Sequence, residues 1–150
     1  MRSEEQGGGS FIRFEPPDTC FIVFVGDVDA SLMRAMNEEL WRAAHDKPYI
    51  FLLLDHSRAG SMSPEARKLA VDGTRNLRVA GAASFGASFT MRVILSLLAR
   101  AHTLFRKETG QVLYFFRDEA EARAWIAERR RALEAETACA CLNRGSPRCP

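Results

Sequence analysis

The stretch that decides the fold is YIFLLLDHSRAGSMSPEAR, from Tyr49 to Arg67. It opens with six apolar residues, 49–54, without alternation, which is typical of a strand buried on both faces. We expect this strand to end at Asp55 and a polar loop to follow. The serine, proline and glutamate at 63–65 then predict a helix start, because each suits the first turn of a helix. This order of strand, loop and helix N-terminus is where open α/β sheets place their functional sites.

The rest of the chain alternates between strand and helix patterns. Further strands are predicted at 11–15, 20–25, 79–85 and 112–116. Helices are predicted from Asp29 or Ser31 to about His45, from Pro64 to about Leu77, from Phe89 to about Lys107, and from Asp118 onward. The order ββαβαβαβα predicts a single α/β domain, with a mixed, mainly parallel sheet of about five strands covered by about four helices.

Helical spacing predicts which side chains face the sheet. In the first helix these are Leu32, Met36, Leu40 and Ala43, with Met33 and Trp41 widening the face. In the helix at 89–107 they are Val93, Ile94, Leu97, Leu98, Leu104 and Phe105, opposite a polar stripe of Arg92, Ser96, Arg100 and Lys107. In the last helix we expect Ala122, Trp125 and Ile126 to point inward.

Composition and charge narrow the function classes. The chain has 150 residues, 47% of them apolar, which suits one globular domain. A net charge of +2 is too small to indicate nucleic-acid binding. Residues 1–10 lack the apolar segment of a secretory signal and are expected to be a disordered leader. The apolar segment 89–105 is interrupted by charge, so we expect no transmembrane span and a cytoplasmic protein.

Cysteine spacing gives little support for a metal centre. Cys20 lies in an apolar strand and is expected to be a core residue. Cys139, Cys141 and Cys149 crowd the last dozen residues, without the second ligand pair that a zinc site needs. We expect a disordered tail with reactive thiols, and neither a metal nor a cofactor.

A hydrolase would need a serine, a histidine and a carboxylate within mutual reach. The segment after the buried strand offers Asp55, His56, Ser57, Ser61 and Ser63. Neighbours on an extended strand point to opposite faces, so Asp55 and His56 are poorly placed to act together. The segment also lacks the G-x-S-x-G motif. We therefore expect no enzymatic activity, with Asp55 ending the strand and His56 in the loop.

A second strand-to-helix junction, GAASFGAS at 81–88, is a weaker candidate for binding an anion or other ligand. It lacks both phosphate-loop motifs, although any helix N-terminus exposes unpaired N–H groups. The candidate residues are Ser84, Gly86, Ser88 and Arg92. The simpler interpretation is that the glycines permit tight packing of a helix on the sheet.

Three segments carry a resemblance to a known family: FLLLDHSRAGSMSPEARK, VAGAASFGASFTMRVILSLLARA and VLYFFRDEAEARAWI. The chain resembles the STAS superfamily over about residues 11 to 130, in particular its bacterial SpoIIAA-like branch, also called STAS/lipid-transfer-like. The resemblance implies a STAS-like domain at 11–133, followed by a disordered cysteine-containing tail at 134–150.

The resemblance also implies a regulatory role through a protein partner. In the anti-sigma-factor antagonists of this superfamily, a D-S-x-G motif starts the second helix, and a partner kinase phosphorylates its serine. Here Ser63 and Pro64 stand where that family has Asp-Ser, so Ser61 or Ser63 would have to be modified instead. We therefore expect a non-enzymatic domain that binds an unidentified protein partner through Ser57, Arg58, Ser61, Ser63, Glu65 and Arg67.

The alternative is a small-molecule or lipid-binding module. Its apolar pocket would lie between the helix at 89–105 and the sheet. A homodimer stays open under either hypothesis.

Overall fold

The sheet has five strands in the order β1-β2-β3-β4-β5. β1 is antiparallel to β2, and all later pairs are parallel. The computed structural model describes residues 9–106 and 113–144. Its elements are β1 (Phe11–Glu15), β2 (Thr19–Val28), α1 (Ala30–Ala44), β3 (Ile50–Met62), α2 (Pro64–Thr74), β4 (Val79–Phe85), α3 (Phe89–Arg106), β5 (Leu113–Phe116) and α4 (Glu119–Arg144). The predicted α/β class and element order are confirmed.

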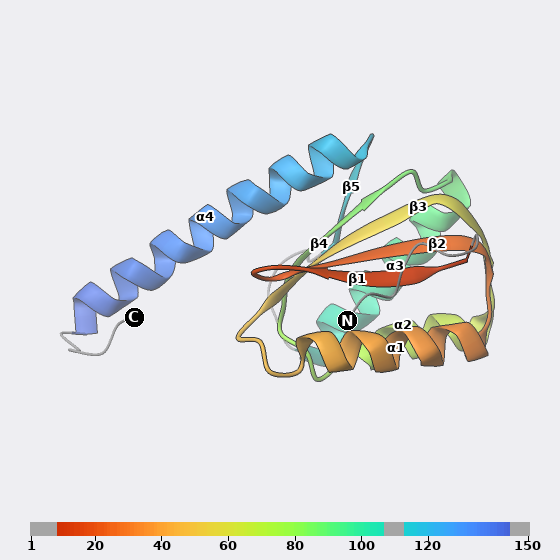
Figure 1. The fold of residues 1–150 in the computed structure, drawn as a ribbon, viewed down its shortest axis with the longest axis horizontal. Coiled ribbons are helices and arrows are strands. Elements are labelled where there is room, and N and C mark those ends of the chain that lie inside the picture. Colours follow the sequence, from red (N-terminus) through yellow and green to blue (C-terminus); the bar gives the residue numbers. More distant parts are fainter. Residues whose placement is uncertain (1–8, 107–112, 145–150) are drawn as a thin grey trace.

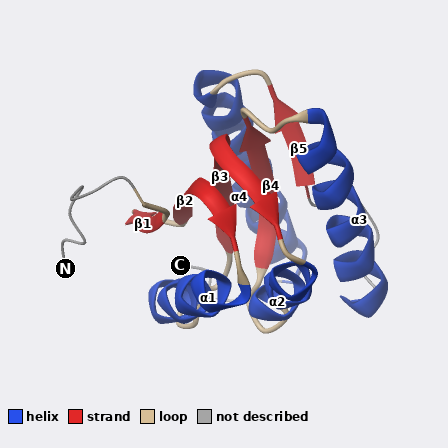
Figure 2. Cartoon of the chain, turned by 90° about the vertical axis from the view of Figure 1, so that its right-hand side faces the viewer, coloured by secondary structure: helices blue, strands red, loops and turns tan. Residues whose placement is uncertain are grey.

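Helices cover both faces of this sheet. α1, α2 and α3 lie on one face and α4 lies on the other (Figures 1 and 2). β3 runs through the middle, so its side chains alternate between two cores. Leu52 belongs to the core under α1, α2 and α3, whereas Phe51 and Leu53 belong to the core under α4. This two-sided burial explains why the first half of β3 is continuously apolar.

β3 is longer than its composition suggests. The prediction that the strand ends at Asp55 and a loop follows is wrong, because β3 continues to Met62. Its polar half pairs with the end of β2, which itself runs past Gly26 to Val28. Two register irregularities, after Val23 and after Gly26, accompany this pairing. Because β2 is distant in the sequence, the local composition of β3 does not indicate this pairing.

The predicted N-caps lie where the sequence places them. Asp29 accepts a hydrogen bond from the Leu32 N–H at 2.8 Å. The hydroxyls of Ser63 and Ser88 do the same for the N–H groups of Ala66 and Met91, each at 3.2 Å. Asp118 accepts from the Glu121 N–H at 2.9 Å. These contacts satisfy N–H groups that a helix start otherwise leaves unpaired.

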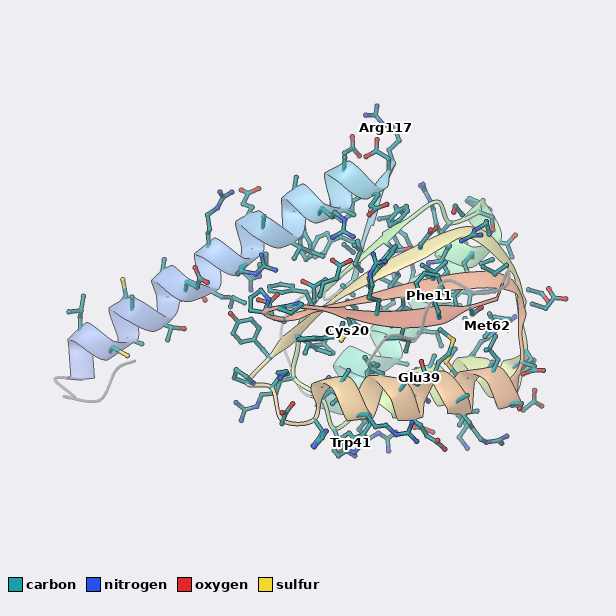
Figure 3. All side chains as sticks on the ribbon, in the orientation of Figure 1. Phe11, Cys20, Glu39, Trp41, Met62 and Arg117 are labelled. Carbon is teal, nitrogen blue, oxygen red and sulfur yellow. The ribbon has the colours of Figure 1, made fainter. Side chains whose placement is uncertain are left out.

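The buried faces of two helices differ in part from the prediction. In α1 the buried residues are Met33, Met36, Leu40 and Ala44, while the predicted Leu32 is only partly buried against the same core. Trp41 is 46% exposed and points away from the sheet (Figure 3). In α3 Met91 and Leu95 are buried, and the predicted Ile94 and Leu98 pack against the same core, whereas Val93 and Leu97 are exposed. The predicted positions Leu104 and Phe105 lie outside the described side chains.

The ends of two helices also differ from the prediction. α2 ends at Thr74 instead of near Leu77. α4 does not give way to a disordered tail at 134 but continues as one helix to Arg144. Figure 1 shows its C-terminal half extending past the sheet. The first eight residues of the leader predicted at 1–10, and the last six residues, 145–150, lie outside the described part of the chain.

Across the described ranges, no helix combines the length and apolarity that a bilayer span requires.

Candidate functional site

The polar ends of β2 and β3 meet through Asp27 and Ser61. One oxygen of Asp27, Oδ1, accepts from the Ser61 backbone N–H at 2.8 Å and from the Ser61 hydroxyl at 2.9 Å. These two hydrogen bonds lower the pKa of Asp27, because they stabilise the charged carboxylate. Ser61 is exposed, so its hydroxyl is open to chemistry from solvent.

A second serine–carboxylate pair lies further back on β3. Asp55 Oδ1 accepts from the Ser57 N–H at 2.8 Å and from the Ser57 hydroxyl at 2.6 Å. Gly86 follows β4 with φ +71°, and a side chain there would collide with the Ser57 backbone. The glycine therefore allows the β4–α3 junction to lie directly against Ser57.

The start of α2 is held at the same edge of the sheet. Ser63 donates its N–H to the Val28 carbonyl at 3.0 Å, which ties the helix start to the end of β2. Arg67 Nε donates to the Met62 carbonyl at 3.1 Å, so this guanidinium already has a structural contact. Arg58 and Glu65 are exposed.

We call the set Asp27, Ser57, Arg58, Ser61, Ser63, Glu65 and Arg67 the switch surface. The contacts above connect its parts: Ser61 to the end of β2, Ser57 to the β4–α3 junction, and Ser63 to Val28. Asp27 is the member that sequence reasoning missed. Only the pairing of β2 with the polar half of β3 brings Asp27 to Ser61, and these two residues are far apart in the sequence.

His56 is not in a loop as predicted but is buried within β3, 3% exposed. Its ring stacks on Phe24 at 4.8 Å between centroids, and Nδ1 lies 3.0 Å from the Ser84 hydroxyl. Burial lowers the pKa of His56 to about 4, since the apolar surroundings disfavour the charged ring.

The residues predicted to bind an anion at the β4–α3 junction do not form one site in the structure. Ser84 is fully buried against His56, so it does not reach the surface. Ser88 is exposed and caps α3, and the guanidinium of Arg92 lies 5.8 Å from the Phe115 ring centroid. Gly81 has a packing role, because a side chain there would collide with Trp125 of α4.

The residues of a hydrolase do not come together here. Asp55 points to the opposite face of β3 from His56 and bonds Ser57, while His56 bonds the buried Ser84. Within residues 9–106 and 113–144, no three His, Cys, Asp or Glu side chains are grouped as a metal site requires. Cys20 is buried, and burial raises the pKa of its thiol to about 11.

Two adjoining apolar cavities lie between the sheet and its three covering helices. One, of about 120 Å³, is walled by α2, α3 and the sheet, including Val71, Leu98 and Leu113. The other, of about 110 Å³, is walled by α1, α2 and the sheet, and His56 lines it. Five residues line both cavities: Leu52, Leu54, Ala70, Thr74 and Leu95.

Comparison with solved structures identifies the fold. The unphosphorylated anti-sigma factor antagonist SpoIIAA superimposes with a TM-score of 0.59 at 15% identity, covering 79% of this chain and 98% of that one. The chain has a SpoIIAA-like, STAS-type fold. An uncharacterised DUF3478-family protein with a SpoIIAA-like fold, from Shewanella loihica PV-4, gives a TM-score of 0.55 at 20% identity, covering 83% and 98%. No family model and no curated protein matches the chain.

Proposed function

We propose that this STAS-type domain is a non-enzymatic regulator that binds a protein partner through the switch surface. The observation that carries the proposal is the exposed Ser61 hydroxyl bonded to Asp27 across β2 and β3. It lies beside the start of α2, at the carboxyl ends of parallel strands, where α/β sheets bind their ligands. The fold shared with an anti-sigma factor antagonist supports the same reading.

The Asp27–Ser61 pair provides a physical basis for a switch. A phosphate on Ser61 would add roughly two negative charges beside the Asp27 carboxylate. Repulsion would break the hydroxyl hydrogen bond of 2.9 Å and separate the ends of β2 and β3. Ser63 is the weaker candidate, because its hydroxyl caps α2 and a negative charge at a helix N-terminus is stabilising.

The experiment is a quantitative pulldown from native lysate with the tagged protein. We expect Ser61→Glu to reduce recovery of a partner at least fivefold, and Ser61→Gln and Ser63→Glu to reduce it less. Ser96→Glu is the charge-matched control, because Ser96 lies on α3 and bonds the Arg92 carbonyl within that helix. If no recovered protein responds to either glutamate at 61 or 63, the switch is refuted.

The second candidate function is binding of a small molecule or lipid. It is favoured by the cavity of about 120 Å³ between α2, α3 and the sheet, the region where the alternative hypothesis expects a pocket. Native mass spectrometry of the purified protein tests it. A co-purifying apolar molecule supports this function, and a clean mass of the protein alone counts against it.

A further inference from the structure

An exposed groove lies between α3 and β5, at the edge of the sheet. It has a volume of about 300 Å³ and is lined by Arg92, Val93, Ser96, Leu97, Arg100 and Phe115. We call it the edge groove, because β5 is the last strand of the sheet and α3 lies beside it (Figure 2). Leu97 is 59% exposed, and Val93 is exposed as well. Apolar side chains that gather at one exposed place, with polar groups around them, often mark an interaction surface.

The charge of the edge groove has one sign. Arg92, Ser96 and Arg100 follow one another at four-residue spacing, so they share one side of α3. α3 contains no Asp or Glu, and among the residues that the structure describes neither guanidinium has an ion-pair partner. The Arg92 guanidinium lies instead 5.8 Å from the centroid of the Phe115 ring. The groove therefore offers two positive groups beside an apolar surface, which is complementary to an apolar segment with carboxylates.

The spacing of the two arginines suits an extended chain. Arg92 and Arg100 are eight positions apart, which is about 12 Å along a helix. In an extended chain, residues i and i+4 are about 13 Å apart and share a face with residue i+2. Carboxylates at i and i+4 would therefore reach both arginines, while residue i+2 lies over the apolar side chains between them. The edge of a sheet is also where extended segments add, through main-chain hydrogen bonds.

Other occupants fit this groove less well. A second copy of α3 would bring the arginines of both copies together, because the helix has no carboxylate. A lipid surface is flat, so it would contact the exposed Val93 and Leu97 but would not enter a groove whose lining includes the partly buried Phe115.

We propose that the edge groove binds an extended acidic segment of a partner protein, with the pattern acidic–x–apolar–x–acidic. The two carboxylates pair with Arg92 and Arg100, and the apolar side chain packs on Val93 and Leu97. The edge groove shares no residue with the switch surface, so this interaction does not depend on the proposed function.

The test titrates the full ¹⁵N-labelled chain with the peptide Thr-Glu-Thr-Leu-Thr-Glu-Thr and follows the amide signals of Leu97 and Phe115 by NMR. We expect both signals to shift, and the dissociation constant to rise about threefold in Arg100→Gln, as for the loss of an exposed ion pair. Arg129→Gln is the control, because it makes the same change of charge at an exposed position of α4. Ser96→Glu should weaken binding more, since it places a carboxylate between the two arginines.

A second peptide, Thr-Glu-Glu-Thr-Leu-Thr-Thr, has the same composition with adjacent carboxylates and should bind more weakly. Equal binding of the two peptides would reduce the interaction to net charge and overturn the proposed pattern. The proposal also fails if millimolar peptide shifts neither signal, or if Arg129→Gln weakens binding as much as Arg100→Gln.

A membrane is tested as the competing occupant. If the chain sediments with phosphatidylserine vesicles, loses this binding in Leu97→Ser and does not respond to the peptide, the groove binds lipid and the proposal is overturned. Because Ser96→Glu and Leu97→Ser leave every residue of the switch surface unchanged, failure here leaves the proposed function standing.

Discussion

At the scale of single residues, His56 couples the stability of the fold to pH. Burial holds the pKa of its ring at about 4, whereas an unfolded histidine titrates near 6.5. The nearby Asp55 carboxylate opposes this shift only in part. Between these two values the unfolded chain binds more protons than the folded one, so stability falls as the pH falls. The difference in pKa corresponds to a loss of roughly 3 kcal/mol by about pH 4.

We expect the free energy of unfolding to drop by roughly 3 kcal/mol between pH 7 and pH 4 in the wild-type protein, and by much less in His56→Phe. Urea unfolding at several pH values measures this difference. Glu15, Asp27 and Asp118 have lowered pKa values, so their contributions disappear at the acid end of the range in both proteins. His45→Gln should keep the wild-type slope. Parallel curves for His56→Phe and the wild-type protein would show that His56 is not the titrating group.

At the scale of elements, two arginines attach α4 to the N-terminal hairpin. Arg130 makes a two-pronged contact with the buried Asp18, through Nε at 2.8 Å and Nη2 at 2.6 Å. Arg123 contacts Glu15 in the same way at 2.7 and 3.1 Å. Asp18 is only 5% exposed, and Arg130 contacts both of its carboxylate oxygens. Removing one member of a buried pair is costly, because the other is left charged and unpaired.

Arg130→Met should therefore destabilise the fold by about 3 kcal/mol. The midpoint of urea unfolding gives the value, and the exposed neighbour Arg129→Met provides a control in the same turn of α4. Adding Asp18→Asn to Arg130→Met should restore part of the loss, because the unpaired charge is then gone. A loss below about 1 kcal/mol would mean that the pair behaves as an exposed salt bridge.

The elements also show which parts of a fold are readable in sequence. The N-caps at Asp29, Ser63, Ser88 and Asp118 were predictable because capping depends on residues a few positions apart. The strand structure of the polar half of β3 was not predictable, because its partner strand ends about thirty residues earlier in the chain. In α3, apolar character misassigned Val93 and Leu97, which are exposed despite their hydrophobicity.

The residues of the candidate site were likewise predictable only where the signal is local in the sequence. Ser61 and Ser63 were identified because the start of α2 is a local signal, and their role as a switch stays a proposal. Asp27 and the buried His56–Ser84 contact depend on pairing between strands, so neither could be inferred from local pattern. The sequence therefore locates the edge of the sheet that carries polar groups, but not the contacts among them.

At the scale of the whole molecule, α4 extends further than the body that it covers. Leu133 is partly buried against the core under α4, and every side chain at 135–140 is exposed. Leu142 is 82% exposed. Helical stability in proteins comes mostly from packing of an apolar face, and this segment has none against the sheet. We therefore keep the proposed boundary of the folding unit at residue 133.

A chain that ends at Glu134 should unfold within about 1 kcal/mol of the full chain, because the side chains at 135–140 and that of Leu142 are exposed. Leu133→Ala in the full chain should cost more than this truncation, since it removes a packed side chain. Urea unfolding of the three proteins tests the order. If the truncated chain loses more than about 2 kcal/mol, the distal half of α4 belongs to the cooperative unit and the boundary at 133 is wrong.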